Sequence, residues 1–215
     1  QAAMAGYALD WIDGFSVDGD VRYNAVFRPA GNVAWQAVHG LSAAQYQQRF
    51  DAITGQGFRP TQVESYSSNG EVRYAAIFRK DNGPATLAYH GLTAQQHQQR
   101  FDDWTKDGYR PRNIAVTAVN GQPRYTVLYE KVDIGSWQAK SRLSPDEYQQ
   151  AFADNSAQGR KPIYLNAYGL DGNTHFSAIF ASKPTGALKA RHGLSKQQYQ
   201  SDWESTTGAG YLTRV

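Results

Sequence analysis

The sequence predicts an α+β fold made of four tandem repeats, each with three strands followed by a helix. Two features that recur every 51 residues support this prediction. One is a glycine that precedes an aromatic or basic residue, and the other is an Asn-Gly or Asp-Gly pair. The glycines are Gly6, Gly57, Gly108, Gly159 and Gly210, and the pairs begin at Asp18, Asn69, Asn120 and Asp171. A fixed period of this kind is the signature of repeat proteins, in which one unit cannot bury its apolar face alone.

We therefore expect a single repeat domain over residues 1–215. The β-β-β-α repeats are placed at approximately 6–56, 57–107, 108–158 and 159–209, with a C-terminal strand at 210–215. Because each unit needs a neighbour, we expect the units to stack into a curved or closed array, similar to a propeller or a toroid.

Each repeat opens with a hairpin. Asn-Gly and Asp-Gly are typical of type I′ turns, in which both central residues have positive φ. After the turn of the second copy, Val72, Tyr74, Ala76 and Phe78 face one way and the residues between them face the other, which is the period of a strand. The opposite face of this strand carries an aliphatic residue in every copy, so we expect both faces to be covered. These residues are Val26, Ile77, Leu128 and Ile179.

A third short strand and a helix complete the repeat. We expect the third strand at 33–39 in the first copy and at 135–141 in the third. The helix then starts at a capping box, a Ser or Thr followed three residues later by Gln or Glu. The four caps are Ser42, Thr93, Ser144 and Ser195. Recurring glutamines on each helix, Gln47, Gln98, Gln149 and Gln200, are interpreted as structural links between copies.

Composition excludes several functional classes. The chain has 215 residues, 40% hydrophobic, with 22 basic and 19 acidic side chains and no cysteine. Without cysteine there is no disulfide framework, thiolate zinc site or thiol nucleophile. No segment approaches the about 18 consecutive apolar residues of a membrane span, so we expect no membrane insertion. The net charge of +3 comes without a basic run, so we expect no nucleic-acid partner.

The repeat motif resembles a known family. Gly-Tyr-Arg-Pro, a short strand, Asn-Gly, Arg-Tyr-x-x-x-Phe and His-Gly-Leu-Ser-x-x-x-Tyr resemble the bacterial tandem repeat domain in the N-terminal region of polyglycine hydrolases, from Gly6 to Val215. In that family such repeats often precede a β-lactamase-like serine hydrolase domain and help to recognise or position its substrate. The Ser-x-x-Lys motif of that domain is absent here. The resemblance therefore implies a non-catalytic module.

Three sets of residues are candidate ligand-binding sites. His39, His90 and His192 recur before the helix caps, where they could converge on a metal or a small anion. We favour a structural role, because metal sites need a defined ligand count, and we predict no metal or cofactor. Arg22, Arg73 and Arg124 could clamp carboxylates, phosphates or sugar hydroxyls, or form ion pairs with residues such as Asp20 or Glu71.

Tryptophan is the third candidate. Trp35 and Trp137 occupy equivalent positions, and an outward-facing indole is a platform for a sugar ring. Core packing is the competing interpretation, and the one we favour.

Together these features predict a secreted, extracellular, non-enzymatic binding module with lectin-like recognition of carbohydrate or cell-wall polymers through several repeat sites. The alternatives are recognition of an extended peptide, as the resemblance implies, and an enzyme with a site between repeats. The ligand's identity and the oligomeric state stay open.

Overall fold

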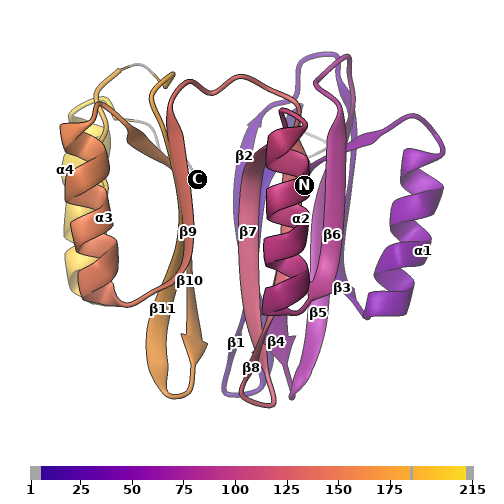
Figure 1. Cartoon of the computed structure of the whole chain (residues 1–215), viewed down its shortest axis with the longest axis horizontal. Helices are drawn as coiled ribbons and strands as arrows, with labels where there is room; N and C mark the ends of the chain where they lie inside the picture. Colours follow the sequence, from indigo (N-terminus) through magenta and orange to yellow (C-terminus); the bar gives the residue numbers. More distant parts are fainter. Residues whose placement is uncertain (1–5, 185, 212–215) are drawn as a thin grey trace.

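A computed structural model describes residues 6–184 and 186–211. The hairpin strands are β1 (Tyr7–Val17), β2 (Asp20–Pro29), β4 (Arg59–Ser68), β5 (Glu71–Lys80), β7 (Arg110–Val119), β8 (Gln122–Glu130), β10 (Lys161–Leu170) and β11 (Asn173–Ala181). The third strands are β3 (Ala34–Leu41), β6 (Thr86–Leu92) and β9 (Trp137–Leu143). The helices are α1 (Ala43–Thr54), α2 (Ala94–Lys106), α3 (Pro145–Ala157) and α4 (Lys196–Gly208). The helices lie on the outside of the array and the sheets lie between them (Figure 1).

The predicted local signals are confirmed. Both residues of every hairpin turn have positive φ, as at Asn69 (51°) and Gly70 (76°). All four capping boxes are present, with each cap side chain accepting from the backbone N–H three residues on. The predicted C-terminal strand at 210–215 lies mostly outside the described residues.

The sheets correct our division of the repeats. Each third strand pairs with the second strand of the next hairpin, giving the orders β3-β5-β4, β6-β8-β7 and β10-β11-β9. The complete unit is therefore β-α-β-β, as in β3-α1-β4-β5, and not the β-β-β-α unit that we expected. A periodic sequence fits either frame, because spacing alone does not reveal which strands are hydrogen-bonded.

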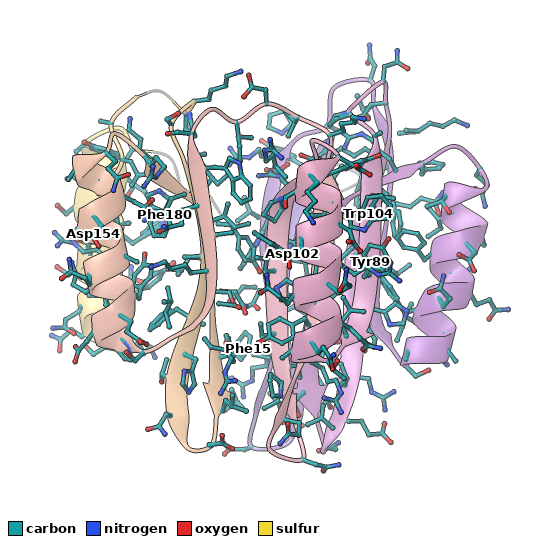
Figure 2. The ribbon with its side chains drawn as sticks, viewed as in Figure 1. Phe15, Tyr89, Asp102, Trp104, Asp154 and Phe180 are labelled. Atoms are coloured by element: carbon teal, nitrogen blue, oxygen red, sulfur yellow. The ribbon has the colours of Figure 1, made fainter. Side chains whose placement is uncertain are left out.

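The two faces of each sheet have different neighbours. One face packs against the unit's own helix: Tyr74, Ala76 and Phe78 of β5 are buried with Tyr46 and Ile53 of α1. In the next unit, Trp104 of α2 lies beside Tyr89 of β6 (Figure 2), with ring centroids 6.5 Å apart.

The other face packs against the neighbouring sheet. Ile77 joins Leu9 and Ile12 of the preceding hairpin in one cluster. Ile77, Leu128 and Ile179 are fully buried, which confirms that both faces of these sheets are covered.

Side-chain amides join neighbouring hairpins. Gln62 accepts from the Ile12 N–H (2.9 Å) and donates to the Ile12 carbonyl (2.7 Å). Asn113 makes the same pair of bonds with Val63, at 3.4 and 2.7 Å. Because β1 and β4 are edge strands of their sheets, these amides satisfy backbone groups that would otherwise be unpaired.

The fourth unit is incomplete. Among the described residues β1 and β2 form a two-stranded sheet, without a third strand or a covering helix of the kind that the other hairpins have. At the other end of the chain, α4 has no buried residue. The described strands form no closed barrel or propeller, so the closed array that we predicted is not established.

One variation between copies gives a testable result. His97 stands where the other complete units have Tyr46 and Tyr148, stacks on Tyr125 (4.5 Å, 11°), and its Nδ1 has no partner among the described residues. Burial lowers the pKa of His97 from 6.5 to about 4. Between pH 6.5 and pH 4, His97 is therefore protonated in the unfolded chain but neutral in the folded chain. The free energy of unfolding consequently falls as the pH drops towards 4.

We expect His97→Tyr to remove this acid sensitivity. The free energy of unfolding of the variant should exceed that of the wild type by up to about 3 kcal/mol near pH 4. The difference between the two proteins that arises from the titration of His97 should be smallest above pH 6.5. Urea unfolding at pH 7 and pH 4.5 measures this. Parallel pH profiles for the two proteins would contradict the assignment.

Candidate binding sites at the junctions between repeats

The histidines lie at junctions between units. His90, at the end of β6, reaches back to the preceding unit, where its Nε2 lies 3.0 Å from Gln47 Oε1 on α1. Its ring meets the edges of Tyr46 and Tyr74, each 5.0 Å away between centroids. We call these four residues the His90 junction.

The hydrogen bonds fix the chemistry of this junction. Gln47 Nε2 donates to Asp51 Oδ1 at 2.8 Å, which orients Gln47 Oε1 as the acceptor towards His90. Burial lowers the pKa of His90, so the neutral imidazole is favoured. The His90 Nε2–H then donates to Gln47, and Nδ1 is left as an acceptor for a ligand hydroxyl.

The His192 junction repeats this arrangement. His192 Nε2 lies 3.1 Å from Gln149 Oε1 on α3, and its ring contacts Tyr148 and Phe176 at 4.9 and 5.6 Å. The two junctions therefore have matching contacts in the first and third complete units. Of the four glutamines that we predicted to link copies, Gln47 and Gln149 do so, whereas the described side-chain bonds of Gln98 and Gln200 stay within their own helices.

His39 has only part of this environment. Its Nδ1 lies 3.3 Å from the Tyr23 hydroxyl, and the two rings are 4.9 Å apart. The Tyr23 hydroxyl lies 2.6 Å from that of Tyr66, which also accepts from the Gly40 N–H. A glutamine from a helix, present at the other two junctions, is not among the described contacts of His39.

The second complete unit carries a different pair. Ser141 stands in place of histidine, and Gln98 donates to Asp102 as Gln47 does to Asp51, with no histidine among its described contacts. His39, His90 and His192 therefore contact different partners at separate junctions and do not converge on one site. Among the described residues no group of three His, Asp or Glu side chains could hold a metal ion.

The arginines make local contacts. Arg73 pairs with Glu71 at 2.6 Å within its own strand, and Arg124 donates to the carbonyl of Pro123. Arg22 is exposed. The ion pair of Arg73 therefore lies within one strand and does not join two repeats, which is the kind of ion pair that we had considered.

Both candidate tryptophans are half-buried. Trp35 packs against the Leu9, Ile12 and Ile77 cluster. The Trp137 ring lies 5.8 Å from Phe101 and beneath the guanidinium of Arg110, at 5.2 Å. Each indole thus packs against neighbouring side chains while it stays half-buried.

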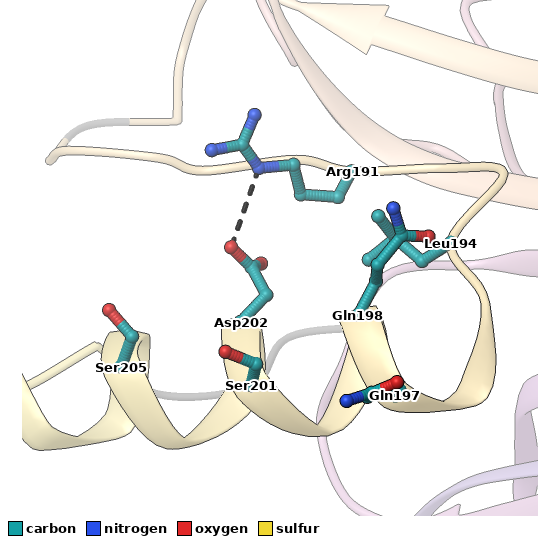
Figure 3. A pocket seen from close by; sticks show the side chains of 7 residues that line it. All are labelled: Arg191, Leu194, Gln197, Gln198, Ser201, Asp202 and Ser205. Carbon is teal, nitrogen blue, oxygen red and sulfur yellow. Dashed lines mark ion pairs between the residues drawn. The ribbon is translucent and has the colours of Figure 1, made fainter.

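A pocket beside α4 was not predicted. Arg191 lies opposite Asp202, 3.5 Å from it, and the pocket continues past Leu194 and Gln198 (Figure 3). Its residues belong to the incomplete unit.

Sequence analysis also missed an acidic pair in which Glu64 is buried and Asp13 is half-buried. Asp13 and Glu64 occupy equivalent positions on β1 and β4. Burial and the nearby Asp13 carboxyl raise the pKa of Glu64, and burial raises that of Asp13. The 51-residue spacing of the two acids was the available signal.

The fold and its junctions define a tandem-repeat protein of β-α-β-β units. The family described as polyglycine hydrolase-like structural repeat matches residues 1–30, 32–81, 83–132, 134–183 and 185–215. The chain belongs to this family, and the three full matches coincide with the three complete units. In the described part of the chain, no helix is long and apolar enough to cross a membrane.

Proposed function

We propose that this chain is a non-catalytic, secreted binding module that recognises a carbohydrate or cell-wall polymer through equivalent junction sites. The observation that supports this is the repetition of one polar and aromatic arrangement at His90 and His192. Each offers an imidazole beside a glutamine amide and the edges of two aromatic rings, and at the His90 junction the imidazole Nδ1 is an acceptor. Sugar rings need this combination of hydroxyl partners and apolar C–H contacts.

Repetition compensates for weak sites. Several equivalent sites on one rigid array raise apparent affinity for a polymer by factors of about 10²–10⁴ without any new contact. We also propose that the units form a closed array, supported by the two half-repeat matches at 1–30 and 185–215.

A panel of glycans and cell-wall polysaccharides at physiological salt tests the function. We expect a polysaccharide to bind and to be displaced by its monosaccharide. His90→Ala combined with His192→Ala should weaken this binding at least about tenfold. Gln98→Ala is the matched control, since Gln98 occupies the equivalent helix position without a histidine partner. All variants are checked for an unchanged unfolding transition.

A silent panel with folded protein would overturn the carbohydrate proposal. Recognition of an extended peptide, which the resemblance to the repeats of polyglycine hydrolases implies, would then be favoured.

A further inference from the structure

The N-terminal hairpin exposes residues that are buried in every other unit. Tyr23 and Phe27 of β2 are 37% and 42% exposed. Their equivalents in β5, Tyr74 and Phe78, are 3% and 0% exposed, because α1 covers them. This hairpin therefore presents an aromatic face of the kind that a helix covers elsewhere in the array.

The helix α4 exposes the complementary face. Tyr199 and Trp203 are 58% and 45% exposed. In the first complete unit, the equivalent residues Tyr46 and Phe50 pack against Tyr74 and Phe78, with ring centroids 5.2 and 5.6 Å apart. Tyr199 and Trp203 are the repeat equivalents of Tyr46 and Phe50. In a complete fourth unit they would pack against Tyr23 and Phe27, the equivalents of Tyr74 and Phe78. Exposed aromatic faces of this kind mark interaction surfaces.

The His39 junction lacks the same helix. His90 has Gln47 and Tyr46, and His192 has Gln149 and Tyr148, whereas the described contacts of His39 include Tyr23 alone. One 51-residue step from Gln149 and Tyr148 leads to Gln200 and Tyr199 of α4. These are the glutamine and the tyrosine that the His39 junction lacks. In the described structure Gln200 donates to Glu204 on its own helix.

We propose that residues 188–208 of the same chain dock on the hairpin β1–β2, where 188–194 form its third strand and α4 covers its aromatic face. Docking completes the fourth unit and builds a third histidine junction from His39, Gln200 and Tyr199. The inference rests on the proposed closed array and is independent of the proposed ligand. The half-repeat matches agree with it, since 185–215 supplies the strand and helix and 1–30 supplies the hairpin.

The other units set the strand register. In the second unit Ala88 lies opposite Leu128, and in the first Ala37 lies opposite Ile77. The same step places Ala190 opposite Val26. In this register Val26 and Ala190 would point to the inner face of the sheet, as Ile77 and Ala37 do. Ala25 would point to the helix face, as its equivalent Ala76 does.

Chain length and proximity favour the chain's own segment over that of a second copy. Residues 81–85 connect β5 to β6 and residues 131–136 connect β8 to β9. Residues 182–187 give the proposed strand a connection of similar length. Burial and Glu64 raise the pKa of Tyr164 on β10, and the Asp13 carboxyl on β1 lies close enough to add to this effect.

Engineered cysteines test the docking, because the natural chain has none. Cysteines at directly opposed positions of an antiparallel pair lie within disulfide reach. We expect Val26→Cys with Ala190→Cys to oxidise within one chain, giving a monomer without free thiols on a non-reducing gel. Ala25→Cys with Ala190→Cys is the out-of-register control and should keep its thiols. Ala37→Cys with Ile77→Cys is the control for a described register.

Two results would overturn the inference. A disulfide that joins two chains would assign the segment to a second copy, and free thiols in the Val26 pair beside an oxidised Ala37 pair would show that the strand does not dock. Glycan binding is not needed for either result.

A second variant needs no cysteine. Trp203→Ala should lower the unfolding temperature by about 5 °C or more if Trp203 is buried on β2. Leu165→Ala, at an exposed residue of β10, should change it little. Equal small shifts for both variants would contradict docking.

Discussion

Replacing Asn113 by alanine is expected to lower the free energy of unfolding by about 2–4 kcal/mol. The Asn113 amide is buried and bonds both the N–H and the carbonyl of Val63 on the neighbouring edge strand. Alanine would leave both backbone groups unpaired in a site that water does not reach, and would open a small cavity. Urea unfolding at pH 7 measures the loss.

Gln36→Ala is the control for this prediction. Gln36 also carries an amide with a side-chain hydrogen bond, to Gln56 at 3.4 Å, but this bond is exposed. We expect a change within about 0.5 kcal/mol. If the two variants lost equal stability, the amide link between hairpins would contribute no more to the free energy of unfolding than an exposed hydrogen bond.

Glu64→Gln is expected to stabilise the protein at neutral pH by about 1–3 kcal/mol. Glu64 is buried, and burial together with the Asp13 carboxyl raises its pKa above 4.5. The folded state therefore holds a proton that the unfolded state releases as the pH rises. Stability is full below pH 4.5 and is lost as the pH rises through the folded pKa.

Glutamine keeps the shape and the hydrogen bond from the Ser65 N–H but does not titrate. The two proteins should thus differ least near pH 4 and most at pH 7–8. Glu71→Gln is the control, because Glu71 is exposed and pairs with Arg73. A wild type whose stability rises between pH 5 and pH 8 as much as that of Glu64→Gln would refute this account.

Local structure could be predicted from the sequence because its signals are local. A turn needs positive φ at two adjacent residues, and a capping box needs two side chains three residues apart. The same 51-residue step predicted that the glutamine at this helix position links copies, which holds for Gln47 and Gln149. Arg142 shows how strongly the repeat constrains the backbone, since it adopts φ 60° where Gly40 and Gly91 stand in other units.

The strand pairing, the burial of Glu64 and the histidine junctions depend on contacts between segments that are far apart in the sequence. Spacing could not tell that β3 belongs to the sheet of β5, because a strand's partner is set by packing. Nor could it place Glu64, since a carboxylate on an alternating strand looks solvent-facing until a neighbouring sheet covers it. The junctions required both the helix position of Gln47 and the next unit's His90.

Hydrogen exchange of the unmodified chain tests the array of four complete units most directly. In a two-stranded hairpin, every second amide of β2 points away from β1 and exchanges freely. If residues 188–194 pair with this edge, the amides of residues 20–29 should be protected nearly as well as those of residues 71–80, which lie in a central strand. Rapid exchange of the outward amides of β2, beside full protection of β5, would contradict the closed array.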